Sequence, residues 1–300
     1  MDPQTKVPTL AIRDLDLSFD AYTGTVDILH GISLHIRQGE RVALVGESGS
    51  GKSVTARIVV GLLQENRRAR ISGHLLFEGR ELETLSKRER RQQRGTKMSM
   101  IFQDPTSSLN PVYPIGQQFF EVLRRGAPAI RRAQADQRAI ALLEEVSISD
   151  PGRVLSSYPF QLSGGMNQRV MIALALANEP SLLLADEPGT ALDVTVQAQT
   201  LALMQRLVEQ HQTSVLFISH NLGVVREFAD RVYVIYKGRI VEHGRTEQIF
   251  DDPRHAYTRA LMAAIPRITG GGMPDISEHS DAYFEPVVVH EGCGEPELQA

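Results

Sequence analysis

The stretch Gly46-Glu-Ser-Gly-Ser-Gly51-Lys52-Ser53 decides the fold class of this 300-residue chain. It matches the pattern G-x-x-x-x-G-K-[ST] without a gap, between a short apolar run, Arg41–Val45, and a helical pattern. The glycines let successive backbone N–H groups turn toward an anion without interference from a Cβ. The following helix points the positive end of its dipole at the same place. This stretch, the glycine loop (residues 46–53), therefore predicts a phosphate-binding site.

The composition excludes several classes of protein. Apolar residues make up 42% and charged residues 23%, which rules out a wholly disordered chain. The formal net charge of −4 argues against generic nucleic-acid binding, which needs a basic face. The longest apolar run, Val170–Ala177, is too short to span a bilayer, and the first 14 residues show no secretory signal. Because Cys293 is the single cysteine, we expect no internal disulfide framework and a reducing, cytoplasmic environment.

Hydrophobic patterning predicts alternating strands and helices. Alternation of apolar and polar residues predicts strands over Leu10–Phe19 and Ile28–Ile36. Short apolar runs predict further strands over Arg41–Val45, Leu182–Ala185, Ser214–Ile218 and Arg231–Tyr236. Helical patterns are predicted over residues 53–63, 117–125, 131–146 and 170–177. This βαβ rhythm is typical of a parallel sheet, and the residues after 270, which lack Lys and Arg, predict a loosely ordered acidic tail with one short strand over Val287–Val289.

Two adjacent acids end the apolar run Ser181–Ala185. Ligands collect at the carboxyl edge of an open α/β sheet. Asp186 fits the Mg²⁺-side acid of a phosphate-loop hydrolase, and Glu187 falls where a carboxylate can orient and deprotonate water. In the glycine loop, Lys52 should neutralise the β and γ oxygens, and the Ser53 hydroxyl should bind Mg²⁺. The alternative is an acidic pair that simply faces solvent.

The rarer motif is Leu162-Ser163-Gly164-Gly165-Met166-Asn-Gln168, which precedes a strongly apolar helix. Ser-Gly-Gly at a helix start forms a second anion site from free N–H groups and a hydroxyl. A single nucleotide site does not need two such cradles. The second one therefore suggests a head-to-tail dimer in which Ser163–Gly165 of one chain caps the nucleotide of the other. The alternative is a flexible loop before a helix.

Taken together, these motifs resemble those of the ATP-binding cassette (ABC) ATPases, and residues 162–168 are similar to their signature motif. The resemblance, over roughly Leu10 to Pro266, implies a P-loop α/β fold with a RecA-like core, an antiparallel β subdomain and a helical subdomain. It implies ATP and Mg²⁺ as ligands. It also implies an ATPase domain over residues 8–259 (helical subdomain roughly 88–165), a C-terminal extension over 249–268 and an acidic tail over 269–300.

The resemblance implies roles residue by residue. Gln103 resembles the glutamine that senses Mg²⁺ and the transmembrane partner, Ala191–Asp193 resembles the D-loop, and His220 resembles the switch histidine at the γ-phosphate. Phe19 is similar to the aromatic residue that stacks on adenine, with Tyr22 as the alternative. The implied catalytic residues are Lys52, Gln103, Glu187 and His220, and the implied metal ligands are Ser53, Gln103 and Asp186. The implied nucleotide-binding residues are Phe19, Gly46, Glu47, Ser48, Gly49, Ser50, Gly51, Lys52, Ser53, Val54, Thr55, Ser163, Gly164, Gly165 and Gln168.

Further stretches resemble one branch of that family, the dipeptide, oligopeptide and nickel importers. These are Phe102–Pro111, Ala191–Gln199 and Ile249–Thr258. Met166, in the signature motif, resembles the D-type ATPase of such systems at that position. The resemblance implies a heterodimer with a second, F-type ATPase, two transmembrane permease subunits, an extracytoplasmic solute-binding protein and a peripheral place at the cytoplasmic face of the inner or plasma membrane. The chain departs from the pattern at Gly189 (usually Thr), Asn221 (usually Asp) and Ala256 (usually Pro), and its single cysteine implies no iron–sulfur centre.

Other functions remain as alternatives. A soluble ABC ATPase that remodels nucleic acid or a protein complex could use the basic run Lys87–Lys97, although such a run is usually a solvated helix face. The net charge and the absence of a long coiled coil oppose it, and no nucleic acid is expected as a partner. A non-catalytic regulator would lack Lys52, Asp186 or Glu187, and a small-molecule kinase would not need the 162–168 motif.

Overall fold

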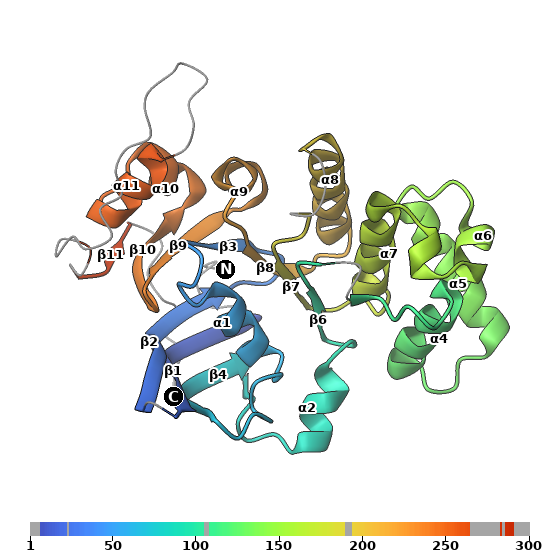
Figure 1. Ribbon diagram of the computed structural model, residues 1–300, viewed down its shortest axis with the longest axis horizontal. Helices are drawn as coiled ribbons and strands as arrows, with labels where there is room; N and C mark the ends of the chain where they lie inside the picture. The colour runs from blue at the N-terminus through green and yellow to red at the C-terminus, as the bar shows by residue number, and fades with distance from the viewer. Residues whose placement is uncertain are drawn as a thin grey trace. The chain divides into compact units, whose positions relative to one another are not determined.

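The computed structural model describes residues 7–22, 24–104, 108–189, 194–264, 283 and 286–290, arranged in two compact units (Figure 1). Unit 1 combines residues 1–84 with 216–300, and unit 2 is residues 85–215. Both units contain helices and strands, which confirms the α/β class predicted from the patterning.

An antiparallel sheet opens unit 1. Its strands, in the spatial order β2-β1-β4-β5, are β2 (Gly24–Ile36), β1 (Leu10–Ala21), β4 (Ala69–Phe77) and β5 (Arg80–Glu81). The pairing of β1 with β2 runs from Leu10 opposite Ile36 to Ala21 opposite Gly24. Leu15 and Leu17 are buried, whereas Asp16 between them is exposed, so the sheet has one apolar and one polar face. Both predicted strands are confirmed and are longer than predicted.

The other strands of unit 1 form the base of the glycine loop. Strand β3 (Arg41–Val45) pairs in parallel with β9 (Arg231–Tyr236), and β9 pairs antiparallel with β10 (Arg239–Arg245). After unit 2, the chain returns to unit 1 within strand β8 (Ser214–Ile218). The helices of the unit are α1 (Lys52–Val59), α9 (Leu222–Phe228), α10 (Thr246–Asp251) and α11 (Ala256–Ala263).

Helix α1 ends earlier than the predicted limit at residue 63. Gly61 has a φ of 74°, and its N–H donates to the carbonyl of Ile58 over 2.8 Å. The N–H of Leu62 donates to the carbonyl of Arg57 over 2.9 Å. These two bonds make a Schellman motif, which terminates a helix at a left-handed glycine.

Part of the C-terminal segment is packed onto unit 1. Strand β11 (Val288–Val289) pairs in parallel with β10 and lies within the strand predicted at Val287–Val289. His290, which follows it, is buried and contacts the Glu242 carboxylate over 2.7 Å. Tyr283 is also buried. Residues 269–282, 284–285 and 291–300 of the predicted tail lie outside the described residues.

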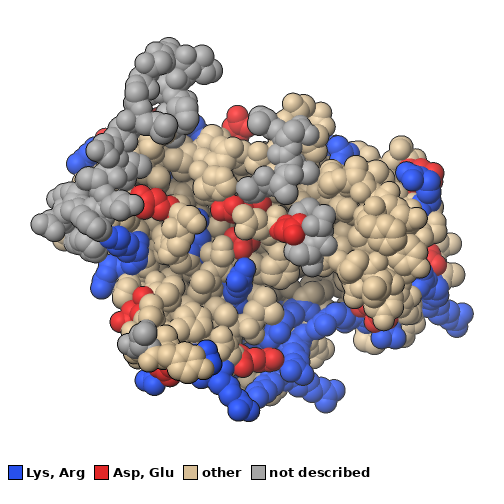
Figure 2. Space-filling view, viewed as in Figure 1, with Lys and Arg blue, Asp and Glu red and all other residues tan. Residues whose placement is uncertain are grey.

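Unit 2 contains a pair of parallel strands and most of the helices. Strand β6 (Met98–Ile101) runs alongside β7 (Leu182–Asp186), with Met98 opposite Leu182. The helices are α2 (Lys87–Gln93), α4 (Ile115–Gly126), α5 (Arg132–Glu145), α6 (Pro151–Ser156), the 3₁₀ helix η2 (Pro159–Gln161), α7 (Gly164–Leu176) and α8 (Val194–Gln210). Helix α2 has no buried residue, and Figure 2 shows Lys and Arg side chains gathered where it lies. The basic run is thus a solvated helix face.

A buried polar cluster ties β2 to β9 in unit 1. The Arg231 guanidinium lies 3.1 Å from Nε2 of His35 and donates to the Tyr233 hydroxyl over 2.8 Å. Because a guanidinium can only donate, Nε2 of His35 must accept, which requires the neutral imidazole. Burial and the neighbouring Arg231 lower the pKa of His35 to about 3. The same causes, with His290, lower the pKa of His243 to about 4.

The lowered pKa values of His35 and His243 predict that the protein loses stability in mild acid. The unfolded chain binds their protons near pH 6.5, whereas the native protein binds them only near pH 4 and pH 3, so protons favour unfolding between those values. We expect the free energy of unfolding to fall from pH 6.5 to 5 by at most about 1.4 kcal/mol per pH unit for each imidazole. Denaturant titrations of wild type, His35→Gln and, as a control, the exposed His74→Gln test this. Equal pH slopes in wild type and His35→Gln would contradict it.

Candidate functional site

The glycine loop is held so closely that its first residue must be glycine. A Cβ on Gly46, where φ is 155°, would lie 2.1 Å from the carbonyl oxygen of Ile235 in β9. Such a contact is far inside van der Waals distance, so any larger residue would displace the backbone of the loop or of β9. The loop therefore lies directly on the strand beside β3.

Lys52 supplies a positive charge inside this loop. Its Nζ donates to the carbonyl oxygens of Gly46 over 2.8 Å and Glu47 over 2.6 Å, and its side chain is only 6% exposed. Gly51, the N-cap of α1, has no side chain to cap the helix. The ammonium and the positive end of α1 thus act at one place, which suits a bound anion.

The other residues of the glycine loop and the first residues of α1 differ in their exposure to solvent. Glu47, Ser48 and Gly49 are exposed, and Ser53 and Val54 are half-buried. Thr55 is fully buried, and its hydroxyl donates to the Gly51 carbonyl over 2.9 Å. That hydroxyl holds the loop onto the first turn of α1.

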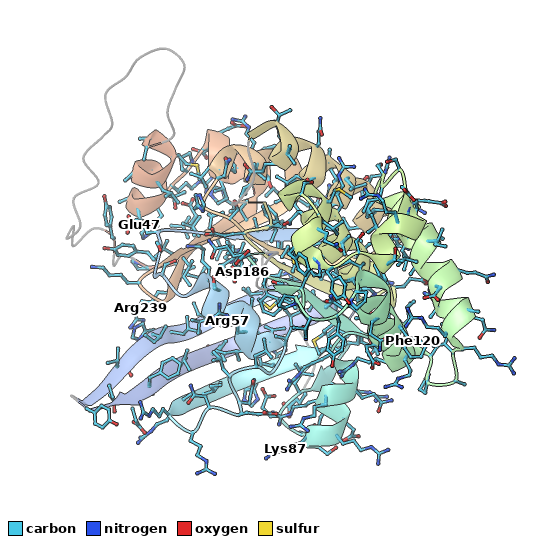
Figure 3. The ribbon with its side chains drawn as sticks, turned by 45° about the vertical axis from the view of Figure 1, so that its right-hand side comes forward. Glu47, Arg57, Lys87, Phe120, Asp186 and Arg239 are labelled. Carbon is cyan, nitrogen blue, oxygen red and sulfur yellow. The ribbon has the colours of Figure 1, made fainter. Side chains whose placement is uncertain are left out.

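A residue that sequence reasoning missed also holds the loop. The backbone N–H of Glu47 (labelled in Figure 3) donates to the hydroxyl of Tyr257 over 3.1 Å. Tyr257 lies on α11, is fully buried, and burial raises the pKa of its hydroxyl. No local pattern could have identified it, because 210 positions separate the two residues.

The two candidate adenine-stacking residues differ in exposure. Phe19 is half-buried on β1, opposite Val26. Tyr22 is 97% exposed, and the Arg68 guanidinium lies 5.3 Å from its ring centroid.

His220 follows β8 in unit 1 and is exposed. The next residue, Asn221, caps α9, and its side chain accepts a hydrogen bond from the N–H of Val224 over 3.3 Å. Asn and Asp are equally good N-caps, so the departure from the usual acid preserves this structural role.

In unit 2 the structure brings Gln103 to the acidic pair. Asp186, labelled in Figure 3, is the buried last residue of β7. Glu187 has a φ of 49°, a conformation uncommon outside glycine, and its Oε2 accepts a hydrogen bond from Nε2 of Gln103 over 2.9 Å. This bond orients the carboxylate. Gly189 has a φ of 102°, which suits glycine better than the usual Thr.

The signature segment (residues 162–168) presents its first residues to solvent. Ser163 caps α7 and accepts a hydrogen bond from the N–H of Met166 over 3.3 Å, and Ser163 and Gly164 are exposed. Gln168 is 0% exposed, and neither atom of its amide makes a hydrogen bond within the described residues. It lies one turn inside the helix, so it does not share the exposed surface of Ser163.

Some predicted residues lie outside the described part of the chain. They are the D-loop, Ala191–Asp193, and residues 105–107 of the Gln103 loop. Within the residues that the structure does describe, no helix is both long and apolar enough to cross a membrane. Those residues also contain no cluster of three or more His, Cys, Asp or Glu side chains placed to hold a metal ion.

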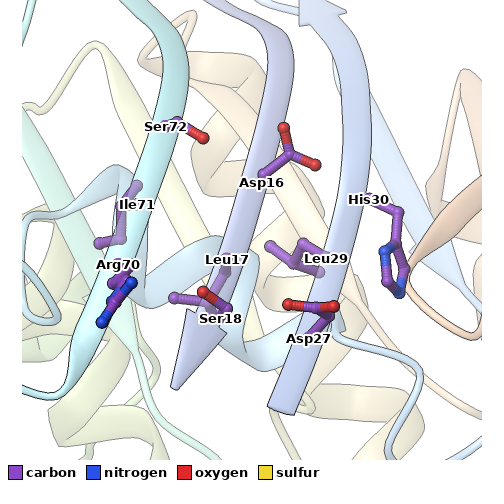
Figure 4. A pocket seen from close by; sticks show the side chains of 9 residues that line it. All are labelled: Asp16, Leu17, Ser18, Asp27, Leu29, His30, Arg70, Ile71 and Ser72. Carbon is purple, nitrogen blue, oxygen red and sulfur yellow. The ribbon is translucent and has the colours of Figure 1, made fainter. Parts of the chain in front are cut away.

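A shallow hollow of about 330 Å³ on the antiparallel sheet is separate from these residues (Figure 4). It is lined by Asp16, Leu17, Ser18, Asp27, Leu29, His30, Arg70, Ile71 and Ser72. Two of its charged groups already have partners, since Asp16 accepts the N–H of Gly31 over 2.9 Å and Arg70 pairs with Asp20. None of the predicted site residues lines it.

Two family models match the chain. The model described as ABC transporter matches residues 29–190. The model described as oligopeptide/dipeptide transporter, C-terminal region, matches residues 241–294. The second match starts before the predicted extension at 249 and continues past its predicted end at 268.

Curated relatives are similar over most of the chain. The peptidoglycan transport ATP-binding protein YejF of Agrobacterium fabrum is 51% identical over 94% of this chain, which spans half the length of that relative. The oligopeptide transport ATP-binding protein OppD of Bacillus subtilis is 47% identical over 89% of this chain and 75% of the relative. The probable D,D-dipeptide transport ATP-binding protein DdpD of Escherichia coli is 48% identical over 86% of this chain and 79% of the relative.

A solved structure is similar in fold. The dimeric post-hydrolysis state of the ATP-binding cassette MJ0796, bound to ADP and Pi, matches with a TM-score of 0.70. The sequences are 26% identical, and the match covers 79% of this chain and 98% of the other.

Two glycine variants separate the effect of the close contact between Gly46 and β9 from the effect of a left-handed backbone conformation. Gly46→Ala places its methyl 2.1 Å from the Ile235 carbonyl, whereas a Cβ on Gly49, with a φ of 80°, meets nothing within 4 Å. We expect Gly49→Ala to destabilise by about 1 kcal/mol through its backbone conformation alone. Gly46→Ala should lower the unfolding midpoint further and abolish nucleotide binding. Equal unfolding midpoints and equal nucleotide affinities for the two variants would show that the contact with β9 is unimportant.

Proposed function

This chain belongs to the ABC transporter family, and we propose that it is the ATP-hydrolysing subunit that powers an importer of peptides or related small solutes. The observation that carries the proposal is the joint presence of the glycine loop, the oriented Glu187 and the exposed Ser163–Gly164 in one chain. The match of residues 241–294 to the oligopeptide/dipeptide transporter C-terminal region, together with the peptide-transport names of the relatives, supports the solute class.

Glu187 is the proposed general base. Its carboxylate would take a proton from the water that attacks the γ-phosphate of ATP, giving ADP and phosphate. The hydrogen bond from Nε2 of Gln103 to Oε2 holds this carboxylate in one orientation. Lys52 would leave the loop carbonyls to neutralise the phosphate oxygens, and His220 would donate a hydrogen bond to the γ-phosphate.

The donor set of the proposed metal site suits Mg²⁺. Ser53, Asp186 and Gln103 offer hydroxyl, carboxylate and amide oxygens, which are the hard ligands that this ion prefers. When bound, Mg²⁺ would supply charge neutralisation at the β and γ oxygens. With few carboxylates in the set, the nucleotide itself and water would have to complete the coordination.

The exposed start of α7 supports a head-to-tail dimer. Ser163 and Gly164 present helix N–H groups and a hydroxyl outward, where the phosphates of a nucleotide on a second subunit could bind. ATP would then join the subunits and its hydrolysis would release them, so that nucleotide shifts an open–closed equilibrium. We propose that the partner is a second, F-type ATPase.

Exposed apolar side chains in unit 2 support contact with a membrane permease. Phe160 is 73% exposed and Val112 71%, and Phe102 and Tyr113 are also exposed. A bond of 2.9 Å from the N–H of Ile115 to the Ser157 carbonyl brings the segments that carry three of these residues together. Exposed apolar side chains that gather in one patch are typical of interaction sites. We propose that two permease subunits dock here, which would hold the chain at the cytoplasmic face of the membrane, and that an extracytoplasmic binding protein delivers the solute.

The alternative, an ATPase that remodels nucleic acid or a protein complex, has no comparable support. The exposed basic helix α2 is the feature that could serve it. The relatives named above are transport proteins, and the net charge is −4.

Removing the proposed base should stop hydrolysis but not binding. Glu187→Gln keeps an oxygen that can accept the Gln103 hydrogen bond, so its geometry survives while its proton affinity is lost. We expect turnover to fall by about 10²–10⁴-fold with ATP affinity unchanged. Phosphate release and nucleotide titration measure the two quantities. Glu179→Gln, at an exposed glutamate that also has a φ near 50°, is the matched control. Normal turnover in Glu187→Gln would refute the assigned role.

An added charge at the signature segment should block pairing. We mix the Glu187→Gln variant with the second ATPase and determine the molecular mass by analytical ultracentrifugation. ATP should increase this mass because the two subunits pair. Gly164→Asp should abolish that increase by repelling the phosphates, although Asp suits the first turn of a helix. Gly152→Asp, in the first turn of α6 where a Cβ meets nothing within 4 Å, is the control. Equal pairing by both Asp variants would contradict the dimer geometry.

A further inference from the structure

One peptide plane of the glycine loop is held from both ends. The Gly46 carbonyl accepts a hydrogen bond from Nζ of Lys52 over 2.8 Å. The N–H on the other side of the same peptide bond, that of Glu47, donates to the Tyr257 hydroxyl over 3.1 Å. Because the C=O and N–H of a trans peptide point in opposite directions, the lysine and the tyrosine fix the orientation of this plane between them.

Tyr257 reaches the loop from the C-terminal extension and is itself held rigidly. Its ring centroid lies 4.4 Å from that of Tyr236 and 5.5 Å from that of Tyr283. The backbone before it is anchored by Glu242, whose carboxylate accepts the N–H groups of Arg254 over 2.8 Å and His255 over 3.1 Å. A hydroxyl carried on such a support has little freedom to follow a moving loop.

We propose that Tyr257 is a positioning residue for nucleotide binding, fixing the Gly46–Glu47 peptide so that the glycine loop keeps its shape when Lys52 leaves the loop carbonyls for phosphate. This deepens the proposed function and rests on it. Lys52 uses the Gly46 and Glu47 carbonyls as its own partners. Once it turns to a phosphate, the tyrosine bond remains to hold the peptide plane. Without that bond, the glycine loop would adopt several conformations, and only one of them would bind nucleotide. The apparent affinity for nucleotide would therefore be weaker.

The test is a hydroxyl deletion with a matched control. Tyr257→Phe keeps the ring and removes the acceptor, whereas Tyr283→Phe removes a hydroxyl from the same aromatic cluster without touching the loop bond. We expect Tyr257→Phe to weaken the binding of a fluorescent ATP analogue, and to raise KM for ATP, by about 5- to 30-fold with kcat within about twofold of wild type. Tyr283→Phe should leave all three quantities unchanged.

Unchanged affinity in Tyr257→Phe would overturn the proposal. So would an equal loss in both variants, which would indicate general packing of the aromatic cluster. A fall in kcat with KM unchanged would also overturn it, because it would place the effect on the chemical step.

A measurement on the wild-type chain keeps the proposal testable if Tyr257→Phe does not fold. The Glu47 side chain is exposed, yet its amide should exchange hydrogen slowly in both free and nucleotide-bound protein, because it is bonded to a buried hydroxyl. Rapid exchange at this amide in the folded chain would overturn the proposal. A different result would contradict the proposed function: the wild-type chain would bind no ATP, although this amide would remain protected from exchange.

Discussion

The glycine loop depends on a contact between backbones that no side chain would permit. The Ile235 carbonyl occupies the place of a Cβ on Gly46, so the turn after β3 lies against β9 with nothing between them. From this contact the loop gains a fixed base, and Lys52 gains two carbonyl partners that keep a buried ammonium satisfied. The parallel pairing of β3 with β9 brings the two backbones together.

The chemistry is divided between the two compact units. Unit 1 carries the glycine loop and His220, and unit 2 carries Gln103, the acidic pair and the signature segment. Each unit organises its own part in advance: the lysine is bound within its loop, and the glutamine already orients the glutamate. Pre-organised groups of this kind lose little on binding, which suits a protein in which nucleotide is proposed to act as the link.

The C-terminal extension does more than follow the ATPase domain. Glu242 on β10, the N-terminus of α11 and the buried His290 form one connected set of hydrogen bonds, and Tyr257 extends it to the glycine loop. The resemblance to importers suggested an extension by its sequence alone. Its contact with the phosphate loop belongs to the three-dimensional arrangement, because residues 47 and 257 become neighbours only when β9, β10 and α11 pack together.

The amino-acid sequence by itself determined the α/β class, most strands and helices and the candidate site, because their signals are local. The spacing of Gly46, Gly51 and Lys52 is a property of one turn, and the apolar runs of β3, β8 and β9 end where the strands end. Side-chain orientation was not determined in this way. Gln168 is buried, the N–H of Glu47 donates to Tyr257 across 210 positions, and Gln103 bonds to Glu187 across 84 positions. Only the tertiary structure decided these three, because burial and long-range hydrogen bonds depend on which surfaces meet, and a local pattern contains no record of the residues on the opposing surface.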